Sequence, residues 1–174
     1  METTETTETT GMSLDLDEEK IVLLSSDNTK REISRKYVPL SKFISTVLEA
    51  DKDESVVKIP LNDYFLEKII QFLKYHPGTP MPVLNRPVAE SEFPPWYAAF
   101  MNDIVSDNVS NIFDIVKAAD FLNIQPLFEL SCAKLALMIR NLSGEEIGAL
   151  FNIDTSYTEE EKKEITRDTK WAEI

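Results

Sequence analysis

The side chains that could carry chemistry in this chain are few and lie far apart in the sequence. His76 is the only histidine and Cys132 the only cysteine, which excludes a two-histidine metal site, an internal disulfide and a multi-cysteine zinc site. His76 stands at the end of a predicted helix, where a charged ring interacts favourably with the carbonyl end of the helix dipole. Cys132 lies in an apolar helical stretch with no base nearby in sequence, which is typical of a buried structural thiol.

Carboxylates are abundant, but they form runs rather than isolated pairs. Glu145 and Glu146 form one run and residues 159–161 another. Both runs fall in the first turns of predicted helices, where negative charge is favourable. The four glycines are scattered, so no glycine-rich phosphate cradle is present. We therefore expect no catalytic residues, no metal and no cofactor, and an enzyme of unknown type stays open only because carboxylates are numerous.

Composition and charge limit the classes of partner. A length of 174 residues predicts one domain with a small appendage, and 18 basic against 31 acidic residues give a net charge of −13. Because phosphates repel such a surface, we expect neither nucleic acid nor a membrane as the main partner. No run approaches the length of a membrane span, and no basic segment followed by an apolar stretch indicates a secretory signal. The lone thiol favours a reducing compartment, the cytoplasm or the nucleus.

The elements that would position any site change in type along the chain. Residues 1–19 begin with a Glu-Thr-Thr repeat and are predicted to be disordered and acidic. The next segment mixes strands with helices, and Asn62 is placed to cap one of these helices. We predict strands over residues 21–24, 30–33 and 56–59, and helices over residues 41–49 and 63–75.

The second half of the chain is predicted to be entirely helical. Residues 76–95 hold six of the nine prolines and should form an irregular connection. Two capping boxes, Ser143 with Glu146 and Thr158 with Glu161, mark the starts of the last two helices. Strands and helices mixed first and helices alone afterwards indicate an α+β fold. We predict the helices over residues 96–104, 111–122, 126–139, from 144 onward, and 159–168.

Two of these helices carry more apolar surface than a small core needs. The helix at 126–139 has only Glu129, Ser131 and Lys134 as polar residues. A helix that is apolar all round is either central in a core or serves two interfaces. Trp171, near the chain end, either folds back on its own domain or anchors an interface, where tryptophan is enriched. Both readings stay open, and two consecutive apolar helices favour a partner-binding face.

Several segments together resemble the SKP-type adaptor of SCF ubiquitin ligases, which joins a cullin scaffold to F-box substrate receptors. The resemblance covers residues 20–174, and the segments occur in order at the spacing of that family. Each segment alone is a weak signal, but the ordered set is specific. The matching segments are residues 22–27, 57–61, 113–124, 143–147, 151–153, 157–161 and 170–173.

This resemblance implies a fold, two partners and two sets of residues. It implies a BTB/POZ domain over residues 20–140, which includes the proline-rich loop 76–95, and a helical F-box-binding extension over residues 141–174. It implies that a cullin binds at Asp120, Phe121 and Asn123. The residues that match the F-box-binding positions of the family are Phe113, Phe128, Cys132, Leu135, Met138, Ile139, Phe151, Ile153 and Trp171.

One departure from the family pattern keeps an alternative open. The usual Asn-Tyr pair of the cullin-binding corner is Asp120-Phe121 here, so one hydroxyl is lost and one charge is gained. The alternative is a structural BTB-type assembly subunit that binds F-box proteins without a cullin. An elongin-C-like adaptor is disfavoured because that family ends before the extension that begins near Ser143. The sequence leaves weak self-association of the free protein open.

Overall fold

The computed structural model describes residues 19–50, 56–76, 93–153 and 157–169. The predicted disordered tail, most of the proline-rich loop, and Trp171 therefore lie outside the described residues. The chain divides into two compact units, one through Leu137 and one from Met138 onward. Each unit is described by itself below.

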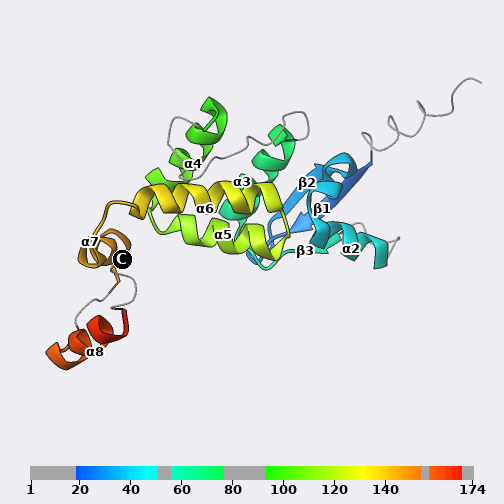
Figure 1. Ribbon diagram of the computed structural model, residues 1–174. Helices are drawn as coiled ribbons and strands as arrows, with labels where there is room; N and C mark the ends of the chain where they lie inside the picture. The colour runs from blue at the N-terminus through cyan, green and yellow to red at the C-terminus, as the bar shows by residue number, and fades with distance from the viewer. Residues whose placement is uncertain (1–18, 51–55, 77–92, 154–156, 170–174) are drawn as a thin grey trace, which may run out of the picture. The chain divides into compact units, whose positions relative to one another are not determined.

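The first unit begins with a small three-stranded sheet (Figure 1). Strand β1 (Lys20–Leu24) pairs antiparallel with β2 (Lys30–Ser34) and parallel with β3 (Val56–Lys58), which gives the order β2-β1-β3. Residues at alternate positions of β1, Ile21 and Leu23, are at most 2% exposed. This alternation is the period of a strand with one face on a core, so the strands predicted from the sequence are confirmed.

Helices supply the rest of the first unit. They are the 3-10 helix η1 (Arg35–Leu40), α2 (Lys42–Ala50), α3 (Asp63–Tyr75), α4 (Pro95–Asp107), α5 (Asn111–Phe121) and all but the last two residues of α6 (Gln125–Ile139). The sequence did not indicate η1, because its residues follow no helical apolar period. Helix α4 extends three residues past the predicted end at Ile104, because its last two residues, Ser106 and Asp107, are polar and do not continue the apolar period. Asp107 in that turn accepts a hydrogen bond from the Tyr64 hydroxyl at 2.7 Å.

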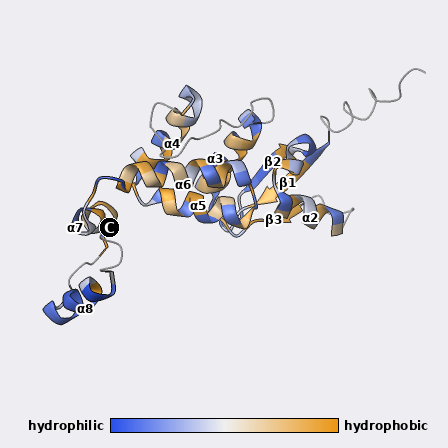
Figure 2. Cartoon of the chain, viewed as in Figure 1, coloured by the Kyte–Doolittle hydropathy of each residue, from blue (hydrophilic) through white to orange (hydrophobic). Residues whose placement is uncertain are grey.

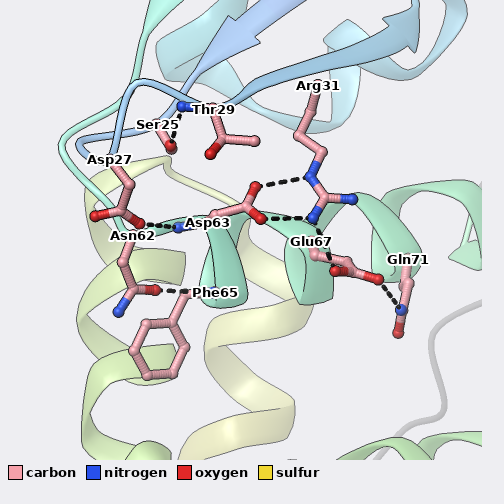
Figure 3. Close-up of polar contacts among 9 residues, drawn as sticks. All are labelled: Ser25, Asp27, Thr29, Arg31, Asn62, Asp63, Phe65, Glu67 and Gln71. Carbon is pink, nitrogen blue, oxygen red and sulfur yellow. Dashed lines mark hydrogen bonds and ion pairs between the residues drawn. The ribbon is translucent and has the colours of Figure 1, made fainter.

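Polar contacts attach the sheet to the start of α3 (Figure 3). The Arg31 guanidinium on β2 donates to both carboxylate oxygens of Asp63 at 2.7 and 2.6 Å and to Glu67 at 2.9 Å. This guanidinium holds the pKa of Asp63 below its usual value. Asn62 accepts from the Phe65 amide at 3.1 Å, which confirms the predicted cap, and Asp27 accepts from the Asp63 amide at 2.7 Å. The backbone amides of Asp63 and Phe65 in the first turn of α3 therefore have acceptors, one from the β1–β2 turn and one from the capping residue.

An aromatic cluster joins the end of α3 to the start of α4, the two elements on either side of residues 77–92. Trp96 is stacked between Tyr75 and Phe100, with ring centroids 3.7 and 5.0 Å away. His76 stacks on Phe72 at 5.2 Å. Stacked and edge-on aromatic pairs contribute beyond the area they bury, so this cluster positions α4 against α3.

The second unit contains α7 (Gly144–Phe151) and α8 (Glu159–Thr169). Both predicted capping boxes are confirmed: Ser143 and Thr158 each accept from the amide of the glutamate three residues on, at 3.3 Å. Glu146 and Glu161 in turn accept from the amides of Ser143 and Thr158 at 2.7 Å. A three-stranded sheet with seven α-helices in the described residues confirms the α+β class.

Candidate partner-binding surfaces

The three residues predicted for a cullin contact lie together where α5 meets α6. The connection Leu122–Ile124 contains Asn123 in the left-handed region, with φ 52°. The amides of Asn123 and Ile124 donate to the carbonyls of Asp120 and Ala119, each at 2.9 Å. A left-handed residue directly after a helix is a common way to end it and reverse the chain. The result is a tight hairpin of two helices that carries Asp120, Phe121 and Asn123 at its turn (Figure 1).

Hydrogen bonds connect the start of α2 to this hairpin turn. The Ser41 hydroxyl donates to the Leu122 carbonyl at 2.6 Å and accepts from the Ile44 amide at 3.3 Å, and Ser41 is fully buried. The Phe43 amide also donates to Leu122, at 3.4 Å. The free amides at the start of one helix thus meet a free carbonyl at the end of another, and both ends are satisfied at once.

The side chains of the hairpin turn itself, Asp120, Phe121 and Asn123, are exposed to solvent, unlike the buried Ser41. Phe121 is 43% exposed, and its ring lies 4.7 Å from the ring of Phe43, tilted by 43°. Asp120 and Asn123 are exposed beside it. We name Phe43, Asp120, Phe121 and Asn123 the corner surface. The sequence did not single out Ser41 or Phe43; a serine just before a helical run is a signal for a cap, but nothing in the sequence relates either residue to position 122.

A second candidate surface runs along α6. Phe128, Cys132, Leu135 and Ile139 follow one another at spacings of four, three and four, so they share one stripe of the helix. All four are partly exposed, whereas Leu127, Leu130 and Ser131 on another side of α6 are completely buried. We name the four partly exposed residues the α6 stripe. Figure 2 shows hydrophobic residues along α5 and α6, in contrast to the mostly hydrophilic α8.

The two surfaces adjoin on the same hairpin. Burial raises the pKa of the Cys132 thiol, and the negative charge of Asp120 raises it further. A charge from the corner surface therefore acts on a residue of the α6 stripe. The raised pKa keeps the thiol protonated at neutral pH, but the side chain is partly exposed and not buried as the sequence predicted.

The remaining residues predicted for F-box binding are placed less uniformly. Phe113 is partly exposed on α5. By helical periodicity, Met138 falls beside the α6 stripe rather than on it. In the second unit, Phe151 is 7% exposed and Ile153 is 55% exposed. Of these two predicted contact residues, only Ile153 is therefore accessible in the chain alone. Trp171 lies outside the described residues.

Comparison with known proteins identifies the family of this chain. A model described as "Skp1 family, tetramerisation domain" matches residues 19–77, and one described as "Skp1 family, dimerisation domain" matches residues 125–172. The S-phase kinase-associated protein 1 homolog of Tetrahymena thermophila is 33% identical over 159 residues, which cover 88% of this chain and 94% of the relative. The chain belongs to the Skp1 family.

Further Skp1 relatives match over similar lengths. The E3 ubiquitin ligase complex SCF subunit sconC of Arthroderma otae is 33% identical over 160 residues, with 88% of this chain and 94% of the relative covered. SKP1-like protein 13 of Arabidopsis thaliana is 33% identical over 155 residues, with 87% and 96% covered. The resemblance found in the sequence is confirmed, and so is the BTB/POZ-type fold of the N-terminal region.

Only part of the corner surface lies within a range matched by a family model. Phe43 and the buried Ser41 lie within the range matched by the tetramerisation domain, and the α6 stripe lies within that of the dimerisation domain. Asp120, Phe121 and Asn123 fall between the two matched ranges. The corner surface is therefore assembled from one matched segment and from the segment that separates the two.

His76 takes part in the aromatic cluster of this Skp1-family fold. Its Nδ1 lies 3.0 Å from the Tyr97 hydroxyl oxygen, and burial lowers its pKa. Burial therefore disfavours the charged ring on which the charge–dipole interaction expected at the helix end depends. Stacking and the hydrogen bond to Tyr97 account for its position.

Two further properties concern only the described residues. Within these ranges, no cluster of three or more His, Cys, Asp or Glu side chains could hold a metal ion. In the same part of the chain, no helix combines the length and the apolar character needed to cross a membrane.

Proposed function

We propose that this chain is a non-catalytic adaptor of an SCF-type ubiquitin ligase, and that it connects an F-box substrate receptor to a cullin scaffold. The relative from Arthroderma otae carries the name of an SCF subunit of an E3 ubiquitin ligase complex. Such an adaptor acts by geometry: it holds a substrate receptor near the ubiquitin-transfer machinery and so raises their effective concentration.

The observation that carries this proposal is the presence of two accessible surfaces at one helical hairpin: the apolar α6 stripe, and the corner surface with its two aromatic rings beside Asp120 and Asn123. We assign the F-box contact to the α6 stripe, extended by Phe113, Met138, Phe151, Ile153 and Trp171. We assign the cullin contact to the corner surface. An interface core is typically apolar and aromatic with few charges, and the α6 stripe has that composition. Two partners on adjoining surfaces of one hairpin would be held close together.

The first test is co-purification of the tagged full-length chain from its own cells with two reciprocal variants. Leu135→Glu places a charge in the α6 stripe and should remove F-box proteins while the cullin is retained. Phe121→Ala should remove the cullin while F-box proteins are retained. Each variant is the matched control for the other, because both alter one partly exposed apolar side chain of the same hairpin.

One observation favours the second candidate function, an assembly subunit that binds F-box proteins without a cullin. Phe121 has no hydroxyl to offer a partner, whereas the related family has a tyrosine at the matching position. Recovery of F-box proteins without any cullin from the unmodified chain would support this alternative. Recovery of neither partner would contradict both functions.

A further inference from the structure

The corner surface contains a pair of aromatic rings from two segments that are far apart in the sequence. Phe43 comes from the first turn of α2 and Phe121 from the last turn of α5, with ring centroids 4.7 Å apart. Among the described residues up to Leu137, Phe121 is the one large hydrophobic side chain that is exposed. The other large hydrophobic side chains among these described residues are at least partly buried, so the exposure of Phe121 sets it apart from them.

The backbone beneath the two rings is held by hydrogen bonds between α2 and the hairpin turn. Ser41 and Phe43 both donate to the Leu122 carbonyl, and the Lys42 amide donates to that of Asn123 at 3.5 Å. The rings therefore sit on a junction that is already ordered before any partner arrives. A preformed surface binds with a smaller loss of conformational entropy than one that orders on binding.

The chemistry of the two rings defines what they can bind. Neither ring offers a hydrogen-bond donor or acceptor, so burial of apolar area against them favours an apolar side chain as their partner. The nearby Lys117 pairs with Asp114, and the Asp120 carboxylate next to Phe121 is exposed. A basic side chain would complement it, and the net charge of −13 favours encounter with a basic surface.

We propose that Phe43 and Phe121 together form an aromatic shelf, and that Phe43 determines specificity for a cullin-type scaffold that inserts an apolar side chain flanked by a basic one. This inference rests on the proposed cullin contact and extends it to α2. Phe43 supplies apolar contact area next to a residue that cannot donate a hydrogen bond. The shelf thus accounts for how a corner without a tyrosine hydroxyl can retain a cullin.

The test measures the affinity of the purified full-length chain for the full-length cullin of the same organism. Phe43→Ala and Phe121→Ala should each weaken binding about tenfold or more. The affinity lost by the double variant should be smaller than the product of the two single fold-changes, because the rings act as one shelf. Phe43→Leu should restore most of the affinity. Thr46→Ala, an exposed position on the same helix, is the matched control and should bind as the unmodified chain does.

A second measurement avoids any effect of the substitutions on folding. Amide exchange over α2 is compared in the unmodified chain with and without cullin, and protection at residues 42–46 is expected. Unchanged exchange there, or full affinity of Phe43→Ala beside a weakened Phe121→Ala, would show that the contact stops at α5 and would overturn the shelf. Absence of cullin binding by the unmodified chain would instead reject the cullin contact itself, and the shelf with it.

Discussion

Three helices of this protein begin with the same hydrogen bond in different surroundings. Ser41, Ser143 and Thr158 each accept from the amide three residues later at 3.3 Å. At α7 and α8 the hydroxyl residue exchanges hydrogen bonds with a glutamate of its own helix, and both caps are exposed. At α2 the Ser41 hydroxyl donates to Leu122, a carbonyl from a distant helix, and is buried. The same local cap therefore starts a helix in one region and locks two segments together in the other.

The largest expected effect is at Ser41. Ser41→Ala removes the α2 cap and the buried hydrogen bond to Leu122, and should lower the free energy of unfolding by about 2–3 kcal/mol. Urea denaturation of the full chain measures this change. The matched control is Ser45→Ala on the same helix, whose hydroxyl donates to Val38 at 3.1 Å in a partly buried position, and its effect should be smaller. Equal losses at both positions would mean that Ser41 is only a local cap.

The next effect compares two asparagines with the same backbone conformation. Asn123 at the hairpin turn and Asn152 at the end of α7 have φ 52° and 53°. Alanine at either position should destabilise its own region by about 1 kcal/mol, because alanine lacks the short polar side chain whose local hydrogen bonds help asparagine to adopt the left-handed region. Asn123→Gly should be tolerated better than Asn123→Ala. Because only Asn123 lies in the corner surface, its alanine variant should also weaken cullin binding, whereas Asn152→Ala should not alter the corner surface.

A smaller and more local effect is expected at the exposed caps. Ser143→Ala should destabilise α7 by about 1 kcal/mol, the usual contribution of a serine cap. Amide exchange over residues 144–151 should accelerate while exchange over α2 stays as in the unmodified chain. Thr158→Ala is the parallel variant for α8. If Ser143→Ala also accelerated exchange in α2, the effect of this cap would not be local to its own helix.

The smallest effect is the pH dependence of the same caps. Hydrogen bonds from Ser143 and Thr158 hold the pKa values of Glu146 and Glu161 below their usual 4.5. An acid whose pKa is lowered by folding stabilises fully above its unfolded pKa and loses that contribution as pH falls through its folded pKa. Amide exchange in α7 and α8 should therefore rise as pH drops below about 4.5, after correction for intrinsic rates. The α2 cap has no titratable partner, and an equal rise there would contradict the comparison.

Local features were predicted well from the sequence. The α3 cap at Asn62 and both glutamate capping boxes were found because donor and acceptor stand three residues apart. Helix bounds followed from apolar periodicity, and the error at the end of α4 arose where the last turn is polar. His76 lies at a helix end as the sequence predicts, but burial lowers its pKa and so disfavours the charged form that a helix dipole would stabilise. This lowering of the pKa by burial depends on residues that surround His76 in the fold and cannot be identified from the sequence next to it.

The candidate surfaces were predicted in part. The family resemblance pointed to Asp120, Phe121 and Asn123, and the structure places them at one turn. It could not point to Phe43, because the contact between α2 and α5 depends on how the chain folds between them. The excess of apolar residues on α6 was visible in composition. Only the structure separated the buried Leu127 and Leu130 from the partly exposed Phe128 and Leu135.

The sequence by itself determined the strands and α-helices of this protein, the caps of α3, α7 and α8, and the family to which it belongs. These follow from interactions between residues a few positions apart and from ordered motifs along the chain. The tertiary structure alone decided which side of α6 stays accessible and which residue stands beside Phe121. The Ser41–Leu122 hydrogen bond joins positions 81 residues apart, and such a contact exists only after the core has brought the two helices together.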